Sequence, residues 1–331
     1  MNRLIITKNT DPWHNLALEE HLFDTHEAGF TLYLWQNQNT VVIGRNQNAW
    51  KECRLSLLEQ EGGRLARRTS GGGAVFHDLG NLNFTFLATR GGYDVRRQLS
   101  VITEAVKSLG VDARFTGRND ILAFGKTGEP MCDAGAKFSG NAFRLSGAAG
   151  LHHGTLLVRA DMEKLSRYLA PSEDKLKAKG IESVRARVCN LSDYLNALSI
   201  DDVKEAVTRA FAREYGETQT LFEEELDQSA VARIAEKHAS RTWRLGETPA
   251  FDMELYERFP WGGLELQLSF SRGKIANARA FSDAMDENFI LRIPEALTGC
   301  SFESAAMAEA VKALSCPEAE DVAAWLMEKG F

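Results

Sequence analysis

Three consecutive glycines, Gly71–Gly73, follow two arginines and precede an extended apolar run, and this segment constrains the fold more than any other. Glycine has no Cβ, so it adopts backbone conformations that other residues avoid and lets a ligand lie against the chain. Successive backbone N–H groups in such a loop can form an anion-binding nest. Arg68 is a suitable bidentate partner for a phosphate or carboxylate. The same residues also fit a plain hairpin turn, so the segment alone predicts either an anion-binding loop or a turn.

The length of the chain predicts two domains. At 331 residues it exceeds most single hydrophobic cores. A link that contains glycine and proline, Gly246–Pro249, divides it into a large domain, residues 1–245, and a small C-terminal domain, residues 246–331. Internal repeats and low-complexity segments are absent from the sequence.

The composition excludes several classes of protein. The chain is 44% hydrophobic and 26% charged, as soluble globular proteins are, and no apolar run approaches the ~20 residues that span a bilayer. The N-terminal segment is not a signal peptide, so we expect a cytoplasmic protein with no membrane partner. A net charge of −7 argues against a nucleic-acid partner. Five scattered cysteines without Cys-x-x-Cys spacing indicate neither a disulfide framework nor a zinc site.

The hydrophobic periodicity predicts an α+β fold, in which the large domain has mainly antiparallel sheets flanked by helices. Expected helices cover residues 15–22 after a cap at Asp11, 95–109 before Gly110, two segments within 192–215 with a start at Val203, and 222–240. Expected strands cover residues 31–35, 40–44, 64–68, 74–77 and 83–88, and two more flank 125–135. The small domain is a separate α+β unit, with strands 263–270 and 274–281 before helices within 303–329.

Two further segments carry candidate binding groups. Asn119 and Asp120 follow a predicted strand, where an amide and a carboxylate can hold Mg²⁺, although an Asx turn without a ligand explains them as well. Lys137 begins a segment of small residues that a ligand can approach. A fixed ammonium beside a glycine nest suits charge that develops on a phosphate or an activated carboxyl group. Taken alone, Lys137 is equally an ordinary surface lysine.

The paired histidines, His152 and His153, invite a metal hypothesis. Adjacent residues on a strand point to opposite faces, however, and no third ligand stands at metal spacing. A structural pair at the start of a strand is therefore the favoured interpretation. Residues 171–187 hold five basic groups and few apolar residues, which fits a mobile lid over an anionic ligand or a solvated connection.

Taken together and in this order, these motifs resemble the lipoate–protein ligase A family of the biotin/lipoate ligase superfamily. The resemblance covers nearly the whole chain. It rests on Asp11–Trp13, Val42–Asn48, Arg67–Asn81, Gly117–Asp120, Lys137–Arg144, His152–Leu157, Lys179–Asn190 and Phe259–Gly263.

The resemblance implies a reaction in two steps. ATP and the lipoate carboxylate first give lipoyl-AMP and pyrophosphate, with Mg²⁺. The ε-amine of one lysine on an acceptor then attacks this anhydride and releases AMP. The expected acceptors are the lipoyl domains of 2-oxoacid dehydrogenase E2 subunits and the glycine cleavage H protein. ATP and lipoate are substrates, no prosthetic group is expected, and the family suggests a monomer.

The resemblance also assigns site residues. Lys137 is the catalytic candidate, because it matches the lysine that bridges the lipoyl carbonyl and the α-phosphate. The adenylate set comprises Arg68, Gly73, Ala74, Val75, Phe76, Asn119, Asp120 and Lys137, with Asp120 as the Mg²⁺ candidate. The lipoate set comprises Ser70, Gly71, Gly72, Lys137, Arg144, His153 and Gly154. The adenylate-binding loop comprises Lys175, Lys177, Lys179, Gly180, Ser183, Val184 and Arg185.

One departure from the family and three alternatives remain open. Residues 121–136 form a longer hairpin than the family pattern predicts, which affects the expected acceptor preference more than the reaction. An octanoyl- or lipoyl-transferase of the same superfamily would use a cysteine nucleophile and no ATP; Cys132 is the one cysteine near the motifs. A catalytically inactive protein that binds lipoyl domains is another alternative. A biotin ligase fits less well, because its glycine loop has a different pattern.

Overall fold

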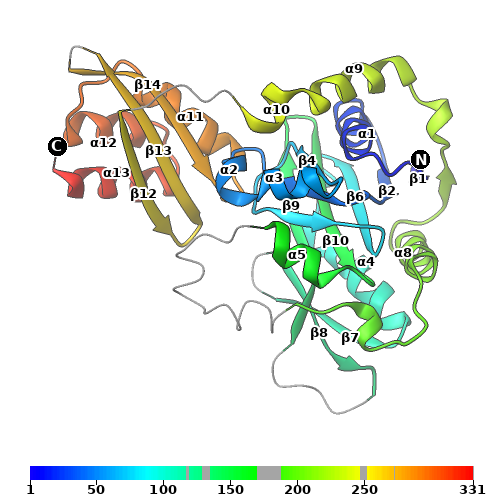
Figure 1. Cartoon of the computed structure of the whole chain (residues 1–331). Coiled ribbons are helices and arrows are strands. Elements are labelled where there is room, and N and C mark those ends of the chain that lie inside the picture. The colour runs from blue at the N-terminus through cyan, green and yellow to red at the C-terminus, as the bar shows by residue number, and fades with distance from the viewer. Residues whose placement is uncertain (117–118, 129–134, 170–187, 247–251, 272, 331) are drawn as a thin grey trace.

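The large unit is built on an eight-stranded sheet with the order β11-β1-β2-β6-β10-β9-β8-β7. The computed structural model describes residues 1–116, 119–128, 135–169, 188–246, 252–271 and 273–330 (Figure 1). Strand β1 pairs in parallel with β2 and β11, and the other pairs are antiparallel, so the sheet is mainly antiparallel as predicted. The strands are β1 (Asn2–Ile6), β2 (Phe30–Trp35), β6 (Asn81–Thr89), β7 (Val111–Thr116), β8 (Asp120–Lys126), β9 (Ala136–Leu145), β10 (Ala149–Leu157) and β11 (Thr218–Thr220).

Helices cover both faces of this sheet, because its strands carry apolar side chains on both faces. On β2, Leu32 and Leu34 join the core beneath α4 (Val95–Ser108) and α8 (Ile200–Tyr215). Their neighbours Tyr33 and Trp35 join a second core beneath α1 (Pro12–Asp24) and α9 (Gln228–Ala239). The strand is therefore buried on both faces, and the sheet lies between two helical layers.

Local capping sets the ends of these helices. Asp11 accepts hydrogen bonds from the backbone N–H groups of Trp13 and His14 and so starts α1, as predicted. Gly110 has a φ of 105° just after α4 and allows the chain to turn there. The predicted start of α8 at Val203 is wrong, because Ser199 forms a capping box and begins the helix at Ile200.

The expected helices on either side of α8 are shorter than predicted. The first segment within 192–215 is only a 3₁₀ turn, η1 (Leu191–Asp193). The stretch 222–240 divides into η2 (Glu223–Glu225) and α9, after which α10 (Arg241–Leu245) begins at a second cap, Ser240.

The glycine triplet joins two strands of a separate three-stranded sheet. Strand β3 (Thr40–Ile43) lies in the centre, with β4 (Arg64–Arg67) parallel on one edge and β5 (Val75–His77) antiparallel on the other. The chain therefore passes from one edge of β3 to the other between β4 and β5, and the hairpin-turn interpretation is wrong. Three short helices pack here, α2 (Ala49–Glu52), α3 (Leu55–Gln60) and α5 (Met162–Tyr168).

The C-terminal part of the chain has a core of its own, formed by buried residues from Leu264 to Leu326. Its antiparallel sheet has the order β12-β13-β14, and three helices cover the sheet (Figure 1). The elements are β12 (Met253–Phe259), β13 (Gly262–Ser271), β14 (Lys274–Ser282), α11 (Glu287–Leu297), α12 (Ser304–Lys312) and α13 (Pro317–Lys329). The boundary near residue 245 adjoins residues 247–251, which lie outside the described residues, and stays a prediction.

Two remaining features concern the composition. Within the described ranges, every helix is too short or too polar to cross a lipid bilayer. Cys53, Cys189, Cys300 and Cys316 carry free thiols. Cys132 lies outside the described residues.

Candidate active site

A cavity of about 370 Å³ lies where the large sheet, the glycine triplet and the C-terminal unit meet. One part of its wall is apolar, from Leu16, Trp35 and Val42. The rest is mostly polar side chains and glycine backbone, with Ala74, Val75 and Ala142 among them. Ten of the predicted site residues line it: Arg68, Gly72, Gly73, Ala74, Val75, Asn119, Asp120, Lys137, His153 and Gly154. The motifs that lie far apart in the sequence therefore meet around a single space.

Lys137 and Asp120 form an ion pair on this wall. The distance from Lys137 Nζ to Asp120 Oδ1 is 2.6 Å, and each side chain is more than one third exposed. The two residues lie on neighbouring strands, since β8 pairs with β9. Gly140 leaves room for the lysine, because a Cβ at that position would lie 3.1 Å from Lys137 Nζ. A small residue on β9 thus allows the ammonium group to lie along the strand.

The buried side chain of Arg68 holds the glycine triplet in place through hydrogen bonds. Its Nη2 donates to the carbonyl oxygens of Gly71 at 2.7 Å and Gly73 at 2.8 Å, and its Nε donates to Ser70 Oγ at 3.1 Å. The side chain is buried, and burial lowers the pKa of its guanidinium to about 10, so it stays charged at neutral pH. Arg68 therefore fixes the loop, and the backbone of the loop faces the cavity.

A buried hydrogen-bond chain runs from Ser70 to Glu19 through His153. Ser70 Oγ lies 2.6 Å from His153 Nε2, and His153 Nδ1 lies 2.8 Å from Glu19 Oε1. Because the Glu19 carboxylate can only accept, Nδ1–H donates to it, and Nε2 of the neutral ring then accepts from the Ser70 hydroxyl. Glu19 also accepts from the hydroxyl of Thr85 at 2.5 Å. We call these three residues, Ser70, His153 and Glu19, the buried relay.

His152 has a separate, structural environment. Its Nε2–H donates to Asn141 Oδ1 at 2.9 Å, and its Nδ1 lies 3.1 Å from the side-chain amide of Gln98. Burial lowers the pKa of the imidazole to about 3, so the ring is neutral. The two histidines are neighbours on β10 but have different hydrogen-bond partners, as expected of adjacent residues that point to opposite faces of a strand. Among the residues that the structure describes, no group of three or more His, Cys, Asp or Glu side chains could hold a metal ion.

Four predicted residues lie outside the cavity wall. Ser70 is in the buried relay. Phe76 packs against Tyr168 with ring centroids 5.4 Å apart. Arg144 lies over the ring of Phe23 at 4.4 Å. Gly71 faces the C-terminal unit, and a Cβ there would lie 2.4 Å from the carbonyl oxygen of Ala284. The predicted adenylate-binding loop lies outside the described residues: Lys175, Lys177, Lys179, Gly180, Ser183, Val184 and Arg185.

Two residues beside the site have no motif that could have revealed them. Glu19 looks like an ordinary helical glutamate, yet it is 1% exposed and bonded to His153. Arg258 belongs to a unit that the sequence suggests is accessory, yet its side chain lines the cavity.

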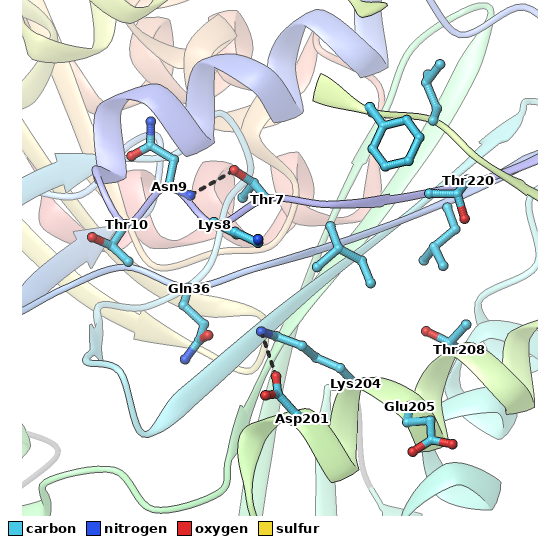
Figure 2. A pocket seen from close by; sticks show the side chains of 14 residues that line it. Thr7, Lys8, Asn9, Thr10, Gln36, Asp201, Lys204, Glu205, Thr208 and Thr220 are labelled. Atoms are coloured by element: carbon cyan, nitrogen blue, oxygen red, sulfur yellow. Dashed lines mark hydrogen bonds and ion pairs between the residues drawn. The ribbon is translucent and has the colours of Figure 1, made fainter. Parts of the chain in front are cut away.

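A second, larger cavity of about 710 Å³ lies between the β1 edge of the sheet and α8 (Figure 2). Its wall carries Thr7, Lys8 and Lys204, and Lys204 pairs with Asp201 at 3.3 Å. None of the predicted site residues lines this cavity. The candidate site is therefore the smaller cavity.

Comparison with known proteins identifies the family. Residues 11–212 match the model of the lipoyl protein ligase A/B catalytic domain. This chain belongs to the lipoyl protein ligase A/B family. Residues 248–326 match the model of the bacterial lipoate protein ligase C-terminus. Family membership makes the chain an enzyme of lipoyl attachment, as the motifs suggested.

Solved structures agree with the family in fold. The chain is similar to LipL1 of P. falciparum, solved in complex with lipoate, at 27% identity over 99% of this chain and 100% of that one, with a TM-score of 0.85. It is similar to the bipartite lipoate protein ligase of Thermoplasma acidophilum, studied with its E2 lipoyl domain, at 28% identity over 75% and 98%, with a TM-score of 0.65. It is also similar to a lipoate-protein ligase A bound with ATP, at 28% identity over 74% and 98%, with a TM-score of 0.61.

Proposed function

We propose that this protein is an ATP-dependent lipoate–protein ligase. In the first step a lipoate carboxylate oxygen attacks the α-phosphorus of ATP, the bond to the β-phosphate oxygen breaks, and lipoyl-AMP and pyrophosphate form. In the second step the ε-amine of an acceptor lysine attacks the lipoyl carbonyl, the bond to the phosphate oxygen breaks, and an amide, AMP and a proton result. Activation is needed because a carboxylate is inert toward amines.

The Lys137–Asp120 pair beside the glycine triplet is the observation that carries the proposal. Both steps place negative charge on phosphate oxygens next to the acyl carbonyl. A lysine held on a cavity wall can stabilise that charge without reorganising, which is the main way such a site accelerates a reaction. The apolar wall of Leu16, Trp35 and Val42 suits an acyl chain. The bare backbone of the triplet lets the acyl and nucleotide parts approach each other.

The predicted residue roles stand as part of this proposal. Lys137 contacts both the lipoyl carbonyl and the α-phosphate. Asn119 and Asp120 offer an amide and a carboxylate to the nucleotide, and one carboxylate together with phosphates and waters is a common Mg²⁺ environment. When bound, Mg²⁺ would neutralise charge on the phosphates. Arg68 acts by holding the triplet, whose Gly72 and Gly73 line the cavity beside the nucleotide.

The acceptor is proposed to be a lipoyl domain. The related ligase of T. acidophilum was studied with its E2 lipoyl domain, which supports acceptors of that kind. The related ligase bound with ATP supports the nucleotide dependence. E2 lipoyl domains and the glycine cleavage H protein remain the expected partners, with a cytoplasmic monomer as the expected state.

A cysteine-dependent transferase has less support. No cysteine is among the described residues that line the cavity. Burial raises the pKa of Cys53 to about 12 and that of Cys189 to about 11, so neither thiol is activated. An assay of pyrophosphate release that depends on both lipoate and ATP separates the two functions. A ligase releases pyrophosphate in equal amount to the lipoyl-AMP formed, and a transferase releases none.

A further inference from the structure

Arg258 brings a positive charge from the C-terminal unit to the cavity. Of the described residues that line the cavity, it alone lies beyond residue 155. It stands on β12, and its side chain is 44% exposed. The large unit supplies the rest of the described wall, so the cavity is completed by a residue from the other end of the chain.

The guanidinium group of Arg258 is held in place by Asp283. Nη1 lies 3.1 and 3.0 Å from the two carboxylate oxygens. One of these oxygens also accepts from the backbone N–H of Gly263 at 2.8 Å. Arg258 also has a side-chain hydrogen bond with Tyr256, but a guanidinium carries five N–H donors, so donors remain beyond those directed at Asp283 and Tyr256. It is oriented in advance and can still bind an anion.

The turn that carries Asp283 also contacts the glycine triplet. The carbonyl oxygen of the next residue, Ala284, accepts from the backbone N–H of Gly72 at 3.0 Å. Gly71 has no Cβ, and one would lie within 2.8 Å of the Met285 carbonyl oxygen. The position of Arg258 relative to the triplet is thus fixed through one short turn.

The other cations on the described wall have different positions. Arg68 is buried and directs its donors to the oxygens of the triplet. Lys137 is paired with Asp120 on β8 and β9. Arg258 is the half-exposed arginine of this set, on the wall that the second unit supplies.

We propose that Arg258 forms a polyphosphate subsite of the cavity and binds the part of ATP that leaves as pyrophosphate. This inference rests on the proposed function. In that reaction the acyl chain lies against the apolar wall, and Lys137 contacts the α-phosphate. Pyrophosphate must depart to solvent, and a half-exposed arginine can bind it at the solvent side of the cavity, because the planar guanidinium matches phosphate oxygens. Arg258 therefore acts in the first step and has no role in the second.

The experiment compares the full-length protein with Arg258→Gln and Arg258→Lys. Calorimetry first measures the binding of inorganic pyrophosphate without catalysis. Steady-state assays then give the KM for ATP in pyrophosphate release that depends on lipoate. A third assay follows transfer from preformed lipoyl-AMP to an isolated lipoyl domain. For Arg258→Gln we expect pyrophosphate binding to weaken and the KM for ATP to rise about tenfold or more, since a charge-assisted hydrogen bond is lost. Transfer from lipoyl-AMP stays as in the wild type.

Two controls make the outcomes decisive. Arg292→Gln removes another exposed arginine of the same unit and should behave as the wild type, whereas Arg258→Lys keeps the charge and should retain part of the binding. Thermal unfolding checks that each variant is folded. Equal pyrophosphate binding by wild type and Arg258→Gln, or an equal loss in both half-reactions, overturns the subsite. A wild type that binds pyrophosphate through Arg258 but releases none from ATP supports the subsite and refutes the proposed ligase.

Discussion

Lys137 Nζ and Asp120 Oδ1 lie 2.6 Å apart across neighbouring strands of the sheet. The carboxylate holds the ammonium group on the cavity wall before any substrate arrives. Gly140, three residues further along the same strand, provides the space in which the lysine lies. The position of the Lys137 ammonium group thus depends on its ion pair with Asp120 and on the absence of a Cβ at Gly140.

Gly140→Ala should lower the rate of lipoylation about tenfold and leave the protein folded. The new Cβ would lie 3.1 and 3.2 Å from Lys137 Nζ and Cε, the far end of a flexible side chain, so the lysine moves at little cost in stability. A misplaced charge stabilises the reaction less. Gly147→Ala is the matched control, because nothing lies within 4 Å of its Cβ. Equal rates for the two variants would show that the position of Lys137 is unimportant.

Gly71→Ala should loosen the contact between the glycine triplet and the C-terminal unit. Its Cβ would lie 2.4 Å from the Ala284 carbonyl oxygen, which is backbone and cannot move aside easily. We expect a loss of about 1–3 kcal/mol in the free energy of unfolding, as for other overpacked sites. Urea unfolding measures it. Gly73→Ala meets open space and serves as the stability control; an equally large loss there would contradict the steric explanation.

Glu19→Leu should destabilise the protein more than Glu19→Gln does. Leucine leaves the buried His153 N–H and Thr85 hydroxyl without their acceptor, at about 1–3 kcal/mol for each group. Glutamine keeps an acceptor oxygen of the same reach. Chemical denaturation gives both free energies. If the two variants unfold at the same denaturant concentration, the buried relay contributes no stability through its hydrogen bonds.

Glu287 should make stability fall as the pH rises. Burial raises the pKa of this carboxyl from its ordinary value of 4.5 to about 7, and nearby Arg144 opposes the shift only in part. Between these values the folded state binds more protons than the unfolded state, so the stabilisation present below pH 4.5 is lost by about pH 7. Glu287→Gln should therefore gain up to about 3 kcal/mol over the wild type at pH 8 and little at pH 4.5. Melting curves across this range test it, and parallel pH profiles would contradict it.

Local signals in the sequence predict much of the fold. The Asp11 cap, the apolar run of β2 and the Gly110 end of α4 all depend on near neighbours, and each is found as expected. Helix α11 was not predicted, because Pro294 interrupts its pattern although the surrounding packing accommodates it. The role of the triplet as a crossover between β4 and β5 depends on β3, which precedes β4 by some twenty residues and lies between the two strands.

The site was predictable only where a motif marked it. Gly72 and Gly73 of the triplet come together with Asp120 and Lys137 on the cavity wall. The pairing of Lys137 with Asp120 depends on the register of β8 and β9, which shifts between Ile121 and Leu122, and a sequence pattern does not reveal such a shift. Arg258 reaches the cavity through a contact between two units, and such contacts leave no local periodicity.

The central claim is tested most directly by pyrophosphate release and lipoyl transfer in one reaction that contains the protein, ATP, Mg²⁺, lipoate and an isolated lipoyl domain. Mass spectrometry of the acceptor and a pyrophosphate assay are read together. We predict one pyrophosphate for each lipoyl group attached, no attachment without ATP, and loss of both signals in a folded Lys137→Ala variant. Attachment without ATP, or near-normal activity of Lys137→Ala, would contradict the account.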